Sequence, residues 1–241
     1  METPLRLRIK LGVMAKYWHP GAVKTRLGKS IGMESAAAIH RAFCLHLART
    51  LGDAADDRAF VITPPEQQSA FASEVRWALE HQSEGDLGTR MRSWFSDSGT
   101  SEQASEQASE QASEQARVLI GADCPLVSKE TIHEAVSLLT HNDIVLGPAR
   151  DGGYYLIALH VPWRPSYSSL MERIPWSSER VFELTCQRAT DAGLNVGVLA
   201  EMEDVDTVSE LHRLRESISG ETVGPLAELS VRLDQILAGD Q

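Results

Sequence analysis

The chain has 241 residues, of which 42% are hydrophobic and 24% are charged, a composition typical of a folded domain and not of a disordered chain. Its formal net charge of −11 at pH 7 excludes a protein that gathers DNA or RNA over a broad basic surface. An anionic ligand therefore has to be held by a local cluster of cations, which favours a small phosphorylated molecule.

The sequence predicts a cytoplasmic protein. Basic residues interrupt the apolar pattern near the N-terminus, and the longest apolar run, 154–159, is far shorter than the ~20 residues of a membrane span. The three cysteines stand far apart without a CxxC pair, which indicates reduced thiols and no zinc site.

The first half of the chain alternates predicted strands with predicted helices. Alternating apolar and polar residues predict the opening strand, and apolar residues at spacing four predict the helices. Phe71, Val75 and Leu79 are expected on one face of the second helix. In order, the predicted elements are a strand over 5–13, a helix over 34–52, a strand over 59–62, a helix over 66–82 and a short helix carrying Leu87, Met91 and Phe95.

Residues 101–116 repeat the sequence Ser-Glu-Gln-Ala four times. The period of four is too short for a solenoid unit, and the repeat has no large apolar side chain. We predict an inserted surface loop that carries no chemistry and adds nothing to the core.

The alternation resumes after the repeat. Short apolar runs predict strands, and Ser177 is expected to cap a helix. In order, the predicted elements are a strand over 117–121, a helix over 129–140, strands over 144–146 and 154–159, a helix over 178–192, a strand over 194–199, a helix after Asp206 and a last helix carrying Leu226, Leu229, Leu233 and Ile236.

This order of elements predicts an α/β domain over residues 1–220, with a mainly parallel sheet and helices on both faces. The last helix, within 221–241, packs either on this domain or on the partner chain of a homodimer. Ligands of such sheets bind beyond the carboxyl ends of the strands, so the loops at that edge are the candidate sites.

The loop of residues 16–26 concentrates cations in an otherwise acidic chain. It contains Lys16, Lys24 and Arg26, and Gly21 adds backbone freedom. Cations beside free backbone amides suit a polyphosphate, which makes this loop a predicted nucleotide site. The alternative is a solvated basic loop.

Two acidic segments are candidates for a divalent cation. Asp123 ends a predicted buried strand, and Asp206 precedes a predicted helix. Carboxylate oxygens are ligands that Mg²⁺ or Mn²⁺ prefers, and such a cation supports a departing diphosphate. The alternatives are that Asp123 caps a turn and that Asp206, or a capping box of Thr207 and Glu210, begins the helix.

A pair of glycines follows Asp151 between two predicted strands. Gly152 and Gly153 indicate a tight turn or a close approach of a ligand to the backbone. Asp151 is a candidate acceptor for a substrate hydroxyl proton, a metal ligand or a turn residue. Tyr154 and Tyr155 point to opposite faces of a regular strand, so at most one is expected to face the site.

Eight motifs follow one another over about residues 7–214: Met14-Ala15-Lys16, Pro20-Gly21, Val23-Lys24-Thr25-Arg26-Leu27, Gly85-Asp86-Leu87-Gly88 with Arg90-Met91, Gly121-Ala122-Asp123-Cys124-Pro125, Gly147-Pro148, Asp151-Gly152-Gly153-Tyr154-Tyr155-Leu156 and Asp204-Val205-Asp206-Thr207. Together they resemble the bacterial GT-A-fold family of nucleotide-diphospho-sugar transferases, which includes the selenodomain-associated transferases. Three features depart from the pattern: the bulky Tyr17-Trp18-His19, a single Asp123 in place of an Asp-x-Asp motif, and the Ser-Glu-Gln-Ala insertion.

The resemblance implies a three-layer α/β/α GT-A fold with a mainly parallel central sheet. It implies catalytic roles for Asp151 and Asp123, and a Mg²⁺ or Mn²⁺ site at Asp123 and Asp206. The small acceptor, whose identity it leaves open, would meet Gly152, Gly153 and Tyr154. The nucleotide-binding residues that it implies are Met14, Ala15, Lys16, Gly21, Lys24, Thr25, Arg26, Asp86 and Arg90.

Three functions follow as alternatives. The first is transfer from a nucleotide-diphospho-sugar with the help of the cation. The second is nucleotidyl transfer, in which a phosphorylated small molecule attacks a nucleoside triphosphate and pyrophosphate leaves. The third is nucleotide binding without catalysis.

Overall fold

The computed structural model describes residues 7–96 and 115–239. Within them, seven strands form one sheet in the order β3-β2-β1-β4-β6-β5-β7. β6 runs antiparallel to β4 and β5, and the other neighbouring strands are parallel, which confirms the mainly parallel sheet. The strands are β1 (Arg8–Lys16), β2 (Asp57–Thr63), β3 (Ala78–His81), β4 (Gln115–Gly121), β5 (Ile144–Pro148), β6 (Tyr154–Val161) and β7 (Val196–Val198).

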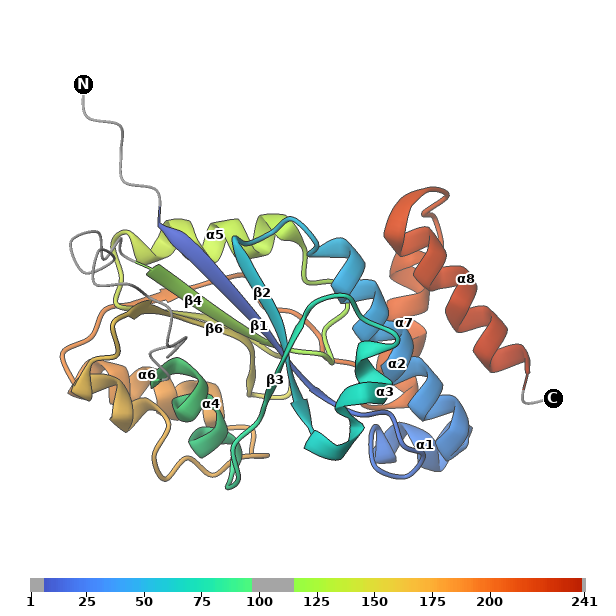
Figure 1. The fold of residues 1–241 in the computed structure, drawn as a ribbon, viewed down its shortest axis with the longest axis horizontal. Helices are drawn as coiled ribbons and strands as arrows, with labels where there is room; N and C mark the ends of the chain where they lie inside the picture. Colours follow the sequence, from blue (N-terminus) through green and yellow to red (C-terminus); the bar gives the residue numbers. More distant parts are fainter. Residues whose placement is uncertain (1–6, 97–114, 240–241) are drawn as a thin grey trace.

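Helices cover both faces of the sheet, which gives the three-layer α/β/α arrangement (Figure 1). The α-helices are α1 (Thr25–Ile31), α2 (Met33–Thr50), α3 (Gln68–Ala72), α4 (Leu87–Ser96), α5 (Lys129–Leu139), α6 (Val181–Asp191), α7 (Val208–Ile218) and α8 (Gly224–Ala238). None of these helices is both long and apolar enough to span a bilayer, within the residues described.

Two apolar clusters sit on opposite faces of the sheet. Helices α2 and α5 bury Leu47 and Ile132 against the face that carries Val13 and Val118. Helices α4 and α6 cover the other face, where Leu119 belongs to a second cluster. The central strands are buried on both faces, as expected of parallel strands between two helical layers.

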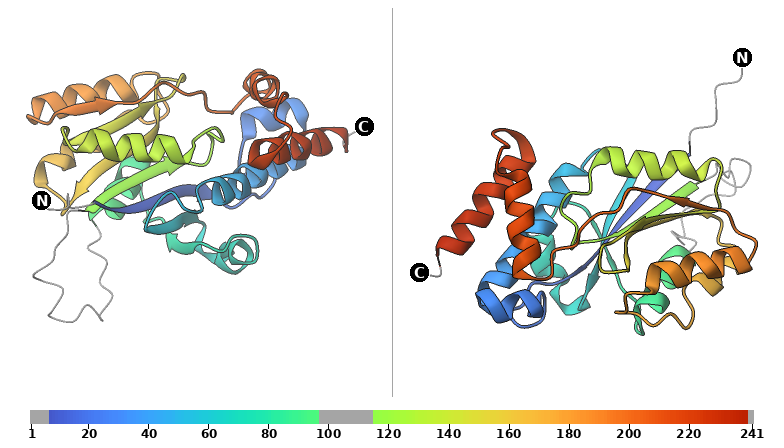
Figure 2. Two further views of the ribbon diagram at one scale, coloured as in Figure 1. Left: turned by 90° about the horizontal axis from the view of Figure 1, so that it is seen from above. Right: turned by 180° about the vertical axis from the view of Figure 1, so that it is seen from behind.

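Helices α1, α2, α7 and α8 gather at one end of the sheet (Figure 2). They share a third apolar cluster, to which α8 contributes the buried Leu229 and Leu233. In this structure α8 therefore packs on the domain formed by the preceding residues.

The predicted helix over 66–82 is wrong in its second half. α3 ends at Ala72, and residues 78–81 form β3, which pairs in parallel with residues 59–62 of β2. Phe71 and Val75 are buried, as the helical spacing suggested, but Leu79 lies on an edge strand. Pairing with an exposed edge of the sheet outweighed a weak helical periodicity.

Two other predictions need correction. α6 begins at Val181, with Arg180 at its N-cap and no capping side chain, so Ser177 does not cap it. Repeat residues 101–114 lie outside the described part of the chain, but Gln115 and Ala116 start β4. Ala116 is fully buried in the apolar cluster on one face of the sheet, so the repeat does add one residue to the core.

Candidate active site

A cleft of about 450 Å³ opens where the carboxyl ends of β1 and β4 meet the loops that follow β5 and β7. This is the edge at which open α/β sheets bind ligands. Its lining residues are Met14, Ala15, Lys16, Thr63, Gln82, Leu87, Arg90, Met91, Leu119, Ile120, Gly121, Asp123, Cys124, Ala149, Asp151, Tyr154, Tyr155, Ile157, Ser177, Asp204 and Asp206.

A larger cavity, of about 800 Å³, lies at the opposite edge, beside α5 and the first residues of β1. It is lined by two histidines, one arginine and no carboxylate. The amino ends of the parallel strands are not where such sheets hold their ligands, so the smaller, acidic cleft is the candidate site.

Lys24 lies buried beneath the cleft and contacts carboxylates from two separate segments of its lining. Its ammonium is ion-paired with Asp123 Oδ1 and lies 3.3 Å from Asp206 Oδ1, while its side chain is only 1% exposed. Val205 N also donates a hydrogen bond of 3.0 Å to the carbonyl of Asp123. Residues 182 positions apart in the sequence thus form one buried cluster, which the sequence did not reveal.

The charges of this cluster shift its pKa values in opposite directions. Burial opposes the charged form of Lys24, but Asp123 and Asp206 raise the pKa of its ammonium above the usual value. Burial likewise opposes ionisation of Asp123, but Lys24 and His40 hold the pKa of that carboxyl well below its usual range. The ion pair is therefore charged at neutral pH.

His40 supports Asp123 from α2. Its Nδ1 lies 3.5 Å from Asp123 Oδ1, and its Nε2 lies 3.0 Å from the carbonyl of Lys16. Burial opposes the charge on His40, but Cys44 and Asp123 raise the pKa of the imidazole. One oxygen of Asp123 thus contacts two buried bases, while the side chain as a whole remains 47% exposed.

Four carboxylates line the cleft: Asp123, Asp151, Asp204 and Asp206. Burial, followed by the like charges of Asp151 and Asp206, raises the pKa of Asp204 to about 6. Burial and the like charges of its neighbours both disfavour the ionised form of Asp204, and a cation bound beside these carboxylates would stabilise it.

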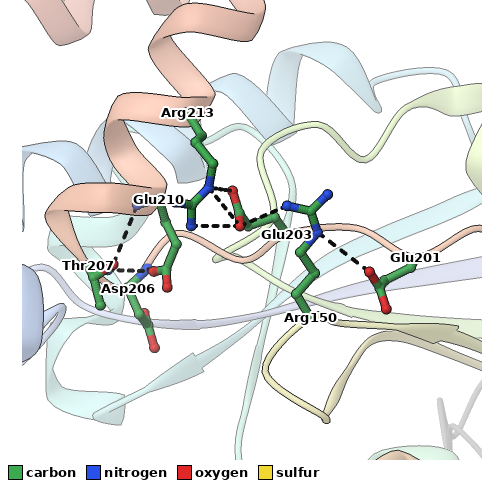
Figure 3. A network of polar contacts seen from close by, with 7 residues as sticks. All are labelled: Arg150, Glu201, Glu203, Asp206, Thr207, Glu210 and Arg213. Carbon is green, nitrogen blue, oxygen red and sulfur yellow. Dashed lines mark hydrogen bonds and ion pairs between the residues drawn. The ribbon is translucent and has the colours of Figure 1, made fainter.

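A polar network holds the acidic segment before α7 (Figure 3). Glu203 accepts hydrogen bonds of 2.8–3.0 Å from Arg213 and one of 3.2 Å from Arg150. Thr207 and Glu210 form the capping box of α7, as one sequence alternative had it, so Asp206 does not cap the helix. The Asp206 carboxylate is left for Lys24 and the cleft.

Two cations line the cleft itself. Lys16 is exposed at the end of β1, and Arg90 is half-buried on α4. Arg90 Nε donates to the carbonyl of Gly85 at 2.9 Å, and its Nη1 donates to Gln82 Oε1 at 3.1 Å. Both partners are uncharged, so the charge of this oriented guanidinium can meet an anion.

The glycines after Asp151 shape the loop that carries it. Gly153 N donates to Asp151 Oδ1 at 2.8 Å, and Gly152 has φ +87 and packs so closely on Glu179 that a Cβ would lie 2.1 Å from its carbonyl oxygen. Tyr154 and Tyr155 both line the cleft, which corrects the prediction that at most one would. The two tyrosines pack with apolar clusters on opposite faces of the sheet, so the cleft lining includes residues from both faces at the start of β6.

The structure brings together many of the predicted site residues. Lys24 lies beneath the cleft, and Gly21, Thr25 and Arg26 are exposed outside its lining. Gly152 and Gly153 are half-buried and also lie outside the lining. Asp86 accepts hydrogen bonds from the backbone and hydroxyl of Thr89 and so starts α4 next to the cleft. Those in the lining are Met14, Ala15, Lys16, Arg90, Asp123, Asp151, Tyr154 and Asp206.

Sequence reasoning did not assign site roles to Asp204, Gln82, Thr63, Ser177 or His40. Asp204 was visible in its motif, two residues before Asp206. Nothing in the sequence indicated a site role for the other four. Their positions near the cleft depend on tertiary structure, such as the sheet order, the turn after β3 and the packing of α2.

The donor groups of the cleft fit a hard divalent cation. Among residues 7–96 and 115–239, no three His, Cys, Asp or Glu side chains are close enough together to enclose a metal. Mg²⁺, however, is commonly held by one or two carboxylates together with waters and substrate phosphates, and not by a complete protein cage. Asp123 and Asp206, which both contact Lys24, are the residues that would provide such a partial, all-oxygen site.

The sheet order, with one antiparallel strand between β4 and β5, and the acidic cleft at the carboxyl edge define the GT-A class of nucleotide-diphospho-sugar transferase folds. The chain belongs to a family of uncharacterized proteins conserved in bacteria (DUF2064), whose model matches residues 46–178.

Solved structures share this fold. A provisionally named nucleotide-diphospho-sugar transferase from Desulfovibrio desulfuricans G20 is 26% identical, with a TM-score of 0.79 over 97% of this chain and 98% of its own. A 4-diphosphocytidyl-2C-methyl-D-erythritol synthase from Anaerococcus prevotii DSM 20548 is 13% identical, with a TM-score of 0.50 over 86% of this chain and 96% of its own. No curated protein matches the chain.

Proposed function

We propose that the protein is a transferase that uses a nucleotide-diphospho-sugar donor together with Mg²⁺ or Mn²⁺. The observation that carries this proposal is the cleft itself, which is lined by the carboxylates of Asp123 and Asp206 together with the cations of Lys16 and Arg90 at the carboxyl edge of the sheet. The Desulfovibrio protein, which matches over nearly the whole chain and is named for this activity, supports it.

Asp123 and Asp206 would hold the cation, which supplies electrostatic stabilisation of the departing diphosphate when bound. Lys16 and Arg90 would contact the phosphates, and Met14 and Ala15 would lie against the nucleoside. Lys24 would affect phosphate binding indirectly, because it holds the two carboxylates that bind the cation. Phosphate contacts by Gly21, Thr25 and Arg26 stay predictions.

Asp151, which also lines the cleft, would accept the proton of the acceptor hydroxyl as that oxygen attacks the sugar carbon. Gly152 and Gly153 would set the position of Asp151, and Tyr154 would meet the acceptor. The acceptor is a small molecule, because the whole cleft of about 450 Å³ has to hold the donor as well.

Nucleotidyl transfer is the alternative, since the synthase from Anaerococcus prevotii shares the fold. The same cations and carboxylates would then bind a nucleoside triphosphate, and pyrophosphate would leave. A third alternative is binding without catalysis.

One assay separates the three. The protein is incubated with Mn²⁺ and panels of nucleotide sugars and nucleoside triphosphates. Slow release of a nucleoside diphosphate from one nucleotide sugar is expected, and Asp123→Ala should abolish it. Pyrophosphate release would instead establish nucleotidyl transfer, and binding without turnover across the panels and acceptors would favour the third alternative.

A further inference from the structure

Lys24 occupies an unfavourable position. Its backbone has φ 47 and ψ 41, in the left-handed region that costs a side-chain-bearing residue free energy. Its ammonium is almost fully buried, which adds a desolvation penalty. Two carboxylates offset these costs, so the local structure depends on the contacts with Asp123 and Asp206.

The contacts use one oxygen of each carboxylate. Lys24 meets Oδ1 of Asp123 and Oδ1 of Asp206, and His40 also meets Oδ1 of Asp123. The side chains of Asp123 and Asp206 remain 47% and 37% exposed, and both line the cleft. Lys24 thus neutralises the pair from below while leaving carboxylate surface open to the cleft above.

We propose that Lys24 is a positioning residue that serves as an internal counter-cation and makes the binding of a divalent cation depend on the nucleotide. With Lys24 in place, the two carboxylates present a reduced negative charge, so a free cation binds weakly. A nucleotide diphosphate brings its own negative charge and oxygen ligands, and then the cation binds tightly. This inference rests on the proposed function.

This role differs from direct contact between Lys24 and phosphate. A phosphate-binding lysine strengthens nucleotide binding and leaves the affinity for free cation unaffected. An internal counter-cation lowers the affinity for free cation, because it repels a second positive charge nearby.

The test compares Mn²⁺ affinity in wild type, Lys24→Met and Lys24→Arg. The free Mn²⁺ concentration is followed by electron paramagnetic resonance, with and without UDP, GDP, CDP or ADP. Methionine keeps most of the apolar stem of lysine at a similar backbone cost and ends one atom short of the ammonium, so the variant removes the charge and the hydrogen-bond donors of that group. Arginine restores the charge and is the matched control.

Without nucleotide, Lys24→Met is expected to bind Mn²⁺ about tenfold more tightly than wild type, because the carboxylate pair regains its full charge. Lys24→Arg should bind Mn²⁺ as weakly as wild type, and added nucleotide should strengthen Mn²⁺ binding less in Lys24→Met than in wild type. Unchanged or weaker Mn²⁺ affinity in nucleotide-free Lys24→Met would overturn the inference.

Two further outcomes keep the test decisive. If Lys24→Met is unfolded without metal, Mn²⁺ should restore its far-ultraviolet circular dichroism, and failure to do so at concentrations that saturate wild type with nucleotide would overturn the inference. If no diphosphate or nucleotide sugar promotes Mn²⁺ binding in wild type, the cation of the proposed function fails. The nucleotide-free comparison of Lys24→Met with wild type then still decides the role of Lys24.

Discussion

The side-chain oxygen of Gln82 accepts a hydrogen bond of 3.1 Å from Nη1 of Arg90 at the rim of the cleft. The amide nitrogen of Gln82 donates to the carbonyls of Ala15, at 3.3 Å, and Val61, at 2.8 Å, in β1 and β2. The hydrogen bonds to the two strands therefore fix the amide so that its oxygen faces Arg90. Gln82 in turn orients the guanidinium of Arg90, which belongs to α4.

We expect Arg90→Ala to weaken the binding of a nucleoside diphosphate about tenfold or more, because charged hydrogen bonds contribute ~1.5–3 kcal/mol. Gln82→Leu should weaken it less, since Arg90 keeps its charge and loses only its orientation. Isothermal titration calorimetry measures both. Arg92→Ala is the control, because Arg92 lies on the same helix but pairs with Glu172. An equal effect of Arg92→Ala would rule out a specific role for Arg90.

Lys16 and Arg26 allow a test of which cation meets the phosphates. Lys16 lines the cleft and Arg26 does not. Lys16→Ala is therefore expected to lower nucleotide affinity about tenfold through a lost charged contact, and Arg26→Ala to lower it by less. The same calorimetry decides, and a larger effect of Arg26→Ala would place the phosphates over the loop before α1 instead of in the cleft.

The buried His46 should make stability depend on pH. Burial lowers the pKa of its imidazole in the folded protein. As the pH falls through about 6.5, the unfolded chain takes up this proton first, so the contribution of neutral His46 to stability is present above that pH and is lost below it. Urea unfolding at pH 7.5 and 5.5 should thus show a smaller loss of stability on acidification in His46→Gln than in wild type. An equal or larger loss in the variant would contradict the assignment.

Helix α8 should contribute to the stability of the domain. Leu233 is fully buried in the cluster shared with α2 and α7, so Leu233→Ala is expected to lower the free energy of unfolding by about 2–5 kcal/mol. Val231, which is 58% exposed on the same helix, supplies the control, and Val231→Ala should change it by less than about 0.5 kcal/mol. Equal unfolding midpoints for the two variants would show that α8 unfolds separately from the rest.

Much of the fold was predictable from local pattern. The alternating residues of β1, the spacing of four in α2 and the short apolar runs of β4 to β6 all predicted the observed elements, because burial against the sheet imposes those periods. The edge strand β3 was not predictable in this way. Its residues are held by pairing with β2, a partner that its own periodicity does not specify.

The sequence by itself identified Asp123, Asp151 and Asp206 as candidate acids and residues 16–26 as the basic segment, because residue type and position after a strand are local properties. Only the tertiary structure decided how they combine. In the folded chain Lys24 points inward and contacts Asp123 and Asp206, whereas Arg26 lies outside the cleft lining. Gln82 and Arg90, which follow β3 in the sequence, are part of that lining. The physical reason is that a buried charge takes the partners that sheet order and helix packing bring within contact, and sequence separation does not indicate which these are.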